Sequence, residues 1–187
     1  MALTDPPFRP LPPAASALLR EAGAPARLGA HLRAVHDVVV SLVDWAEVAC
    51  PAAPFDREAV RFGAATHDIG KVLHLGELSE PGTRHEAAGE RLLLEAGVEP
   101  RLARFAGTHG SWGSERAGFE DHLVSLADKI WKGKRQEDLE QLVVERLGLL
   151  NGQAPWEAFL ALDDELTALA AGADARLAFQ NAYPIGA

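Results

Sequence analysis

His67-Asp68-Ile69-Gly70-Lys71 is the most informative stretch of this 187-residue sequence. It follows Phe62-Gly63-Ala64-Ala65-Thr66, a run of small and apolar residues that predicts a buried helix ending at Asp68 or Ile69, since Gly70 stops it. A carboxylate buried there without a partner would cost several kcal/mol, and a bound cation would remove that cost. The stretch therefore predicts a metal site in the interior of the protein.

A long amphipathic helix is expected over residues 26–49, ahead of this stretch. Its apolar residues recur at spacings of three, four and seven, which is typical of a helix with one buried face (Leu28, Val35, Val39, Leu42, Ala46 and Ala49). At about 100° per residue, His31 lies in the middle of that face and His36 lies to one side. His31 is the expected ligand, with two alternatives. In the first, His36 is the metal ligand, because the phase assumed for the helix is off by one turn. In the second, His31 is a hydrogen-bonded residue of the core and not a ligand.

Helices are expected along the rest of the chain, and no stretch predicts a strand. Asp56 fits a helix N-cap, Thr83-Arg84-His85-Glu86 has the pattern of a capping box, and Pro100 fits a first helical turn. We predict an all-α fold, a single bundle of about seven to nine helices. Its expected parts are a proline-rich arm with a short helix (1–25), a metal-binding core (26–135), and C-terminal helices of the same domain (136–187), the last dozen residues forming a tail.

Composition and charge bound the classes of function. Apolar residues make up 48% of the sequence and charged residues 24%, so a sizeable core can form. The formal net charge of -9 argues against binding duplex nucleic acid or an anionic membrane, so an anionic ligand requires a local positive site.

Cys50 is the only cysteine, which suits a reducing cytoplasm. Residues 1–7 lack the features of a signal peptide, and no stretch approaches the roughly 18 apolar residues of a membrane span, so a cytoplasmic protein is expected.

A second carboxylate, Asp128, follows the apolar run Leu123-Val124-Ser125-Leu126-Ala127. With His31 and the His67-Asp68 pair it gives the order H…HD…D. This order, its spacing and the phrases His67-Asp68-Ile69-Gly70-Lys71 and Leu126-Ala127-Asp128-Lys129 resemble the signature of the HD-domain superfamily of metal-dependent phosphohydrolases. The resemblance covers residues 26–135. It implies an all-helical HD bundle in which one divalent ion lies among His31, His67, Asp68 and Asp128.

Two further histidines lie between the His67-Asp68 pair and Asp128. They are His85, in Arg84-His85-Glu86-Ala87-Ala88-Gly89, and His109, in Thr108-His109-Gly110-Ser111-Trp112. The longer order H…HD…H…H…D resembles the branch that holds two metal ions, which includes HD-type symmetrical diadenosine tetraphosphate hydrolases. It implies that His85 and His109 hold a second ion and that Asp68 bridges the two, roughly 3.5–4 Å apart. Imidazole and carboxylate ligands without thiolate suit one or two divalent ions of Fe, Mn, Co, Ni, Mg or Zn.

Several basic side chains near these motifs are candidates for binding a phosphorylated substrate. Lys71 is expected to contact a phosphate or to protonate the leaving oxygen, so Asp68 and Lys71 are the catalytic candidates. Arg84 stands at a predicted helix N-terminus, which is a natural anion site. His74 lies in the loop that follows the motif. The alternative for His74 and Arg84 is simple exposure to solvent.

The predicted helix that carries Asp128 offers further candidates. Lys132 and Arg135 are expected beside the metal-bearing face, where they would bind a distal phosphate. Trp131 or Trp112 would stack on a base, although a tryptophan on a helix face is more often part of the core.

The expected function is that of a metal-dependent phosphohydrolase. A metal-activated hydroxide would cleave a phosphomonoester or phosphoanhydride bond of a nucleotide or related small molecule. Two alternatives stay open at this point: a single-metal nucleotidase or cyclic-nucleotide phosphodiesterase, and a regulatory module that binds metal or nucleotide without turnover. The expected partner is a small phosphorylated substrate, and the sequence does not predict the oligomeric state.

Overall fold

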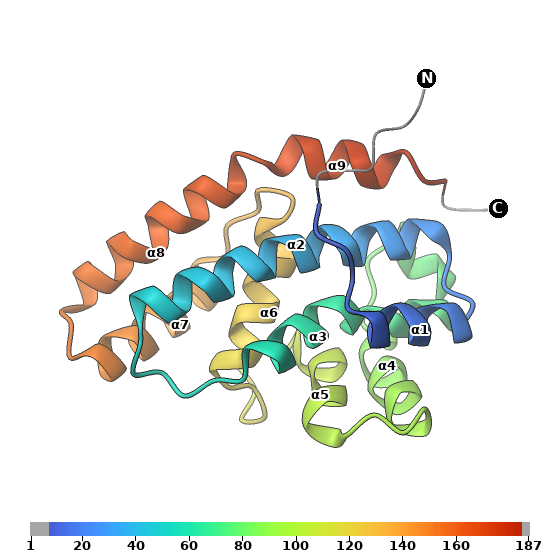
Figure 1. Ribbon diagram of the computed structural model, residues 1–187, viewed down its shortest axis with the longest axis horizontal. Helices are drawn as coiled ribbons and strands as arrows, with labels where there is room; N and C mark the ends of the chain where they lie inside the picture. Colours follow the sequence, from blue (N-terminus) through green and yellow to red (C-terminus); the bar gives the residue numbers. More distant parts are fainter. Residues whose placement is uncertain (1–7, 185–187) are drawn as a thin grey trace.

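The computed structural model describes residues 8–184, which form nine α-helices, two short 3₁₀ helices (η1 and η2) and no strand (Figure 1). The predicted all-α fold is confirmed. The elements are α1 (Pro13–Glu21), α2 (Ala26–Ala49), α3 (Arg57–Thr66), η1 (Ile69–Val72), η2 (Leu75–Leu78), α4 (Arg84–Glu95), α5 (Pro100–Thr108), α6 (Phe119–Ile130), α7 (Glu137–Asn151), α8 (Pro155–Ala170) and α9 (Ala173–Asn181). Within this range no helix combines the length and the apolar character needed to cross a membrane. The expectations for residues 1–7 and for the last three residues of the tail lie outside the described residues.

Helix α2 is the central element of the bundle. It packs against α3, α6, α8 and α9, and Figure 1 shows it between the α8–α9 pair and helices α4 and α5. Its predicted apolar face is fully buried at Leu28, Val35, Val39 and Leu42. Burying one such side chain stabilises a fold by about 1.5–3 kcal/mol, so α2 is held firmly in rotation and His31 is held with it.

The apolar interior consists of two clusters that meet at the His67-Asp68 pair. Ala64 belongs to the larger cluster, which joins α2, α3, α6, α7 and α8. Ile69 belongs to the smaller cluster, which lies between α1, α2, α4 and α5. His67 and Asp68 lie where the chain passes from one cluster to the other, and both are buried.

Local sequence signals set several helix ends. Asp56 caps α3, because its carboxylate accepts the N–H groups two and three residues further on, both at 3.0 Å. Pro100 is the first residue of α5, as expected. Helix α1 ends shortly before Gly23, whose φ of +66° lies in the left-handed region that favours glycine.

The predicted capping box at Thr83 is wrong. The Thr83 side chain makes no capping hydrogen bond. The carboxylate of Glu77, from η2, accepts instead from the backbone N–H of Arg84 at 3.3 Å and of His85 at 3.1 Å. One carboxylate satisfies two free N–H groups and lies at the positive end of the α4 dipole, so this distant cap replaces the local one.

The predicted C-terminal tail is helical for much of its length. Helix α9 packs along α2, and the ring of Phe179 contacts the ring of Phe8 edge-on, with centroids 5.1 Å apart. Arg176 is buried, and its Nε donates to the carbonyl oxygen of Trp131 at 2.7 Å. The sequence pattern hid this helix because an arginine and an aromatic ring replace a regular apolar stripe.

His36 is a core residue. It is buried, and its Nδ1 has no hydrogen-bond partner in the part of the chain that the structure describes. Burial, and to a smaller degree the positive charge of Arg61, lower the pKa of His36 from 6.5 to about 4. The alternative in which His36 replaces His31 as a ligand is wrong, because His31 and not His36 lies against Asp68 and Asp128.

We expect this buried ring to make stability depend on pH. The folded protein binds the His36 proton more weakly than the unfolded chain does, so the stability that neutral His36 contributes is fully present above pH 6.5 and is lost as the pH falls towards 4. Between about pH 7.5 and pH 5, His36 should account for a loss of about 2 kcal/mol. Urea unfolding of chelator-treated protein at the two pH values measures the loss. Between these two pH values, the free energy of unfolding of His36→Gln should fall by about 2 kcal/mol less than that of the unmodified protein. An equal fall in both proteins would contradict the lowered pKa of His36.

Candidate metal centre

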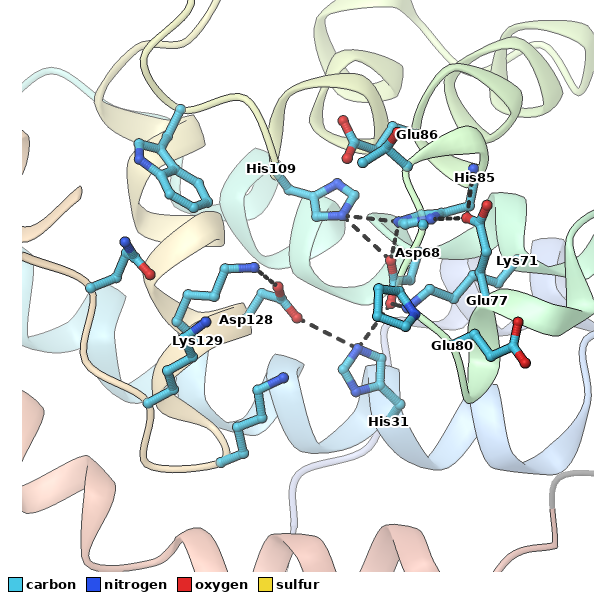
Figure 2. A pocket seen from close by; sticks show the side chains of 18 residues that line it. His31, Asp68, Lys71, Glu77, Glu80, His85, Glu86, His109, Asp128 and Lys129 are labelled. Atoms are coloured by element: carbon cyan, nitrogen blue, oxygen red, sulfur yellow. Dashed lines mark hydrogen bonds and ion pairs between the residues drawn. The ribbon is translucent and has the colours of Figure 1, made fainter. Parts of the chain in front are cut away.

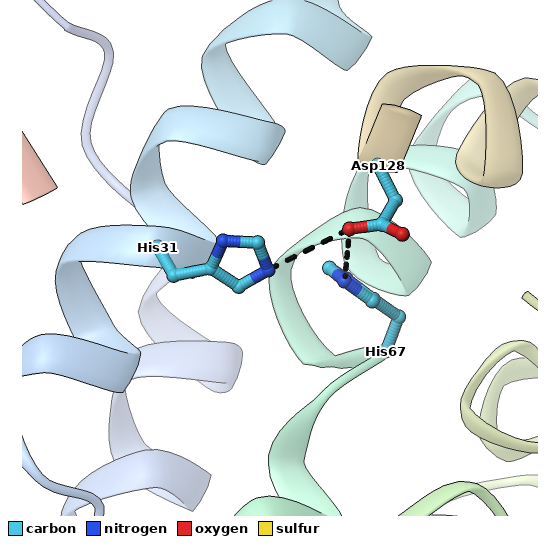
Figure 3. A group of neighbouring side chains, drawn as sticks. All are labelled: His31, His67 and Asp128. Atoms are coloured by element: carbon cyan, nitrogen blue, oxygen red, sulfur yellow. Dashed lines mark ion pairs between the residues drawn. The ribbon is translucent and has the colours of Figure 1, made fainter. Parts of the chain in front are cut away.

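Six predicted ligands from five helices and their ends come together in the interior (Figures 2 and 3). They are His31 (α2), His67 and Asp68 (directly after α3), His85 (first turn of α4), His109 (directly after α5) and Asp128 (α6). His31 and Asp128 are half-buried and the other four are buried. Since the elements that carry them are far apart in the sequence, the site exists only in the folded bundle.

Asp68 lies at the centre of this group, and its two oxygens face different pairs of imidazoles. Its Oδ1 lies 2.9 Å from Nε2 of His85 and 3.4 Å from Nε2 of His109. Its Oδ2 lies 3.1 Å from Nε2 of His31 and 3.6 Å from Nε2 of His67. Asp68 therefore offers one oxygen to a cation beside the His85–His109 pair and the other oxygen to a cation beside the His31–His67 pair.

Asp128 faces the His31–His67 pair (Figure 3). Its Oδ1 lies 3.4 Å from Nε2 of His67 and 3.7 Å from Nε2 of His31. The three donor atoms lie within 4.8 Å of one another, close enough to share a cation. A second set, formed by His85, Glu86 and His109, meets the same distance limit.

Two imidazoles are oriented by backbone carbonyl groups. The Nδ1 atom of His67 lies 2.9 Å from the carbonyl oxygen of Ala64, and Nδ1 of His109 lies 3.1 Å from that of Ala106. In each case the carbonyl belongs to the helix that ends at the histidine. The last turns of α3 and α5 thus fix both rings with Nε2 towards the centre.

The other two imidazoles are oriented by distant side chains. Nδ1 of His85 lies 2.6 Å from Oε2 of Glu77, and Nδ1 of His31 lies 3.2 Å from the side-chain amide of Gln180 in α9. The hydrogen bond with His85 lowers the pKa of Glu77 to about 2. Burial alone would lower the pKa of His85, but hydrogen bonds to Asp68 and Glu77 raise it. All four rings therefore turn Nε2 inward.

Close packing of backbone brings η1 and α4 together at the site. A β-carbon on Gly70 would overlap the carbonyl oxygen of His85 and the amide nitrogen of Gly89. Gly70 is thus required by the approach of α4 and not, as predicted, to stop the preceding helix, because α3 already ends at Thr66 and Gly70 lies within η1. This approach places His85 against Asp68.

The ligand cluster opens onto a cavity of about 580 Å³, a volume typical of small-molecule sites (Figure 2). The cavity is lined by every lysine of the sequence: Lys71, Lys129, Lys132 and Lys134. Nζ of Lys71 lies 2.5 Å from Oδ2 of Asp68, and Nζ of Lys129 lies 2.7 Å from Oδ2 of Asp128. Five carboxylates line the same cavity, those of Asp68, Glu77, Glu80, Glu86 and Asp128, so the lysines together with bound cations would supply the local positive site that an anionic ligand requires.

Comparison with known families agrees with this geometry. A family model described as the HD domain matches residues 27–147, which is more than half of the chain and includes the positions of all six predicted ligands. The chain belongs to the HD domain family. A search of curated proteins and a search of solved structures each found no match. HD domains are typically metal-dependent phosphohydrolases, and the His/Asp clusters of this HD domain are compatible with binding divalent metal.

The residues of this HD domain fit a divalent cation. The Nε2 atoms of His31 and His67 are buried, and neither has a hydrogen-bond partner among residues 8–184. Buried polar atoms without a partner are costly, so a group that binds at this point would stabilise the fold. Imidazole nitrogens and carboxylate oxygens without thiolate suit borderline or hard divalent ions.

Charges within the HD domain keep both aspartates ionised. Burial alone would raise the pKa of Asp68, but the charge of His67 and the close Nε2 atoms of the other three histidines hold it well below its usual range. Burial also opposes ionisation of Asp128, but its contacts with His67 and the charge of Lys129 outweigh this, and its pKa is lowered. Both side chains are therefore carboxylates at neutral pH, the form that binds cations.

Two of the predicted substrate-binding residues, His74 and Arg84, lie outside the cavity. The side chain of Arg84 is 75% exposed and pairs with Glu77 at 3.3 Å. His74 immediately precedes η2 and does not line the cavity. The turn that orders residues 69–78 into two 3₁₀ helices directs Glu77 inward and leaves these two basic residues outside.

The prediction that Arg135 lies beside the ligand face is wrong. The guanidinium pairs with Glu140 at 2.7 Å and with Asp163 at 2.8 Å. Helix α6 ends at Ile130, so the helical spacing that placed Arg135 on the Asp128 face stops before reaching it. Lys132 lines the cavity as expected, whereas Trp131 is buried in the core with its ring against that of His31.

Sequence reasoning missed five residues of the site. Glu77 and Gln180 each orient a histidine from another segment, and nothing local in the sequence indicates either contact. Glu86 was assigned to a capping box, but its carboxylate lines the cavity and belongs to the second donor cluster. Lys129 and Lys134 could have been found, because they flank Lys132 on the segment that carries Asp128.

We expect Gly70→Ala to destabilise the HD domain by about 3 kcal/mol, because a methyl group there collides with backbone that cannot move away easily. Urea unfolding measures the change. The matched control is Gly76→Ala, where a β-carbon meets no atom within 4 Å and the change should stay below about 0.5 kcal/mol. Equal stability of the two variants would contradict the packing argument.

Glu77→Gln should lower the affinity for Mn²⁺ by about 10–100-fold, since the amide removes the negative charge that orients and polarises the His85 ring. Competition with a metal-sensitive dye measures the affinity. Glu80→Gln is the control, because Glu80 lines the same cavity without a contact to a histidine. If both variants bind Mn²⁺ equally well, Glu77 has no such role.

Proposed function

We propose that this HD domain is a phosphohydrolase that cleaves a phosphomonoester or phosphoanhydride bond of a nucleotide or a related small molecule with the help of divalent cations. One observation carries the proposal: six side chains that could hold cations converge at a cavity that every lysine of the chain lines. Hydrolysis of a phosphate ester needs both a Lewis acid at the phosphoryl oxygens and positive charge around them. With divalent cations bound, the site would combine the two.

The cation ligands divide into two sets that share Asp68. One set consists of His31, His67 and Asp128, and the other of His85 and His109, with Glu86 beside them. Divalent ions bound there would polarise the phosphoryl group and lower the pKa of an attacking water molecule. The protein's part is to hold the rings with Nε2 inward, through the contacts at Ala64, Ala106, Glu77 and Gln180.

Lys71 is the side chain best placed to handle the substrate. It projects from η1 into the cavity beside Asp68, with Nζ 2.5 Å from Oδ2. The ammonium group would hold a phosphoryl oxygen, or pass a proton from Nζ to the leaving oxygen as the bond to phosphorus breaks. Lys129, held over the ring of Trp112 at 5.4 Å, would add positive charge on the Asp128 side.

The two carboxylate oxygens of Asp68 face different pairs of histidines, which favours this function over a single-metal nucleotidase or cyclic-nucleotide phosphodiesterase. A site for one ion needs no second pair of imidazoles at Oδ1, yet His85 and His109 lie there and are buried. The non-catalytic regulatory module differs in a measurable way, because it would bind a nucleotide without releasing phosphate.

The deciding experiment combines metal analysis with phosphate release. Protein purified without chelator should contain up to two divalent ions per chain and should release phosphate from members of a nucleotide panel. Asp68→Asn should lose most of the metal and more than about 100-fold in rate, because a neutral amide holds divalent cations much less tightly than a carboxylate does. Asp164→Asn is the control, since this exposed aspartate on α8 forms no ion pair within the described chain.

The outcomes separate the candidate functions. One ion per chain with full activity would favour the single-metal alternative and contradict the roles of His85 and His109. Metal and nucleotide binding without phosphate release would favour the regulatory module. Equal metal content and equal rate in Asp68→Asn and Asp164→Asn would contradict the ligand assignment itself.

A further inference from the structure

The chain leaves α6 through a turn with a defined geometry. Gly133 has a φ of +75°, its N–H donates to the carbonyl oxygen of Ile130 at 2.8 Å, and the N–H of Lys134 donates to that of Lys129 at 3.2 Å. These two bonds and the left-handed glycine form a Schellman motif. The motif fixes the backbone of Lys132 and Lys134 on either side of the glycine.

Helix α9 holds this turn from behind. The carbonyl oxygen of Trp131 accepts from Nε of the buried Arg176, and a β-carbon on Gly133 would lie 3.3 Å from that of Ala173. The turn is thus confined on one side by α9 and opens on the other to the cavity, which both Lys132 and Lys134 line. Their positions are set by the fold, not by a free loop.

Lys132 and Lys134 differ from the other two lysines in their partners. Lys71 and Lys129 each pair with a ligand carboxylate. Throughout residues 8–184, no carboxylate lies within 4.0 Å of the ammonium group of Lys132 or Lys134. Two positive charges at the edge of a cavity, unneutralised in a strongly acidic chain, indicate an anionic ligand.

The location of this pair relative to Asp128 indicates a second anionic group. Lys132 follows Asp128 by four residues and lies just beyond the end of α6, and both side chains line the cavity. A phosphate held at the turn would therefore lie beside a phosphate at the cation ligands without coinciding with it. Ammonium groups on flexible stems suit such a phosphate, since they adapt to its position.

We propose that the Lys132-Gly133-Lys134 turn binds a phosphate group other than the one that reacts, so that this HD domain prefers substrates with two or more phosphates, such as nucleoside diphosphates and triphosphates, over monophosphates. The substrate preference rests on the proposed hydrolase function. Binding of a multiply charged phosphate chain at the turn does not.

Two measurements test the proposal separately. The first is calorimetric binding of tripolyphosphate and of orthophosphate to the full chain without added metal, at low ionic strength to limit screening. The second is kcat/KM for AMP, ADP and ATP with excess Mn²⁺. The test variant is Lys132→Gln/Lys134→Gln. Its charge-matched control is Arg20→Gln/Arg146→Gln, which removes two exposed positive charges away from the cavity.

The lysine variant should bind tripolyphosphate at least roughly tenfold more weakly and orthophosphate within about twofold of the unmodified chain. Its kcat/KM should fall for ADP and ATP far more than for AMP. An unchanged tripolyphosphate affinity, or an equal loss in the arginine control, would overturn the proposal. If no nucleotide is hydrolysed while the difference in tripolyphosphate binding persists, the proposed function fails and the phosphate site at the turn stands.

Discussion

A buried negative charge at Asp68 is the constraint on which this bundle depends. The carboxylate lies between two apolar clusters, where solvent cannot stabilise it, and four imidazoles and one ammonium group surround it. Without those partners the charge would cost several kcal/mol. His67 and Lys71 belong to the same segment as Asp68, but His31, His85 and His109 come from α2, α4 and the end of α5, so the relative positions of these helices are tied to a single side chain.

The ends of helices, more than their middles, deliver the groups to Asp68. His67 follows α3, His109 follows α5 and His85 lies in the first turn of α4. At such positions backbone carbonyl groups or a capping carboxylate are free to hold the second ring nitrogen, as they are at Ala64, Ala106 and Glu77. The same features that terminate the helices therefore orient the ligands.

The sequence predicts the place of a site residue best where a single local pattern, such as helical periodicity or a flanking apolar run, determines that place. His31 could be placed because α2 is long and regular, and Asp128 because an apolar run surrounds it. Arg135 was misplaced because the helical spacing was extended past the end of α6. Glu77 and Gln180 could not be found, since eight and 149 residues separate them from the histidines that they orient. Contacts of that kind depend on tertiary packing, which no local pattern contains.

The contact between α9 and His31 has a consequence for biosynthesis. Ribosomes extend a chain from its N-terminus, so His31 emerges long before Gln180, the residue that holds its ring, and before Arg176, which anchors the turn after α6. A nascent chain that has reached the end of α6 already contains all six predicted ligands but not these two supports. The final geometry of the centre is therefore set only after translation has passed through α9.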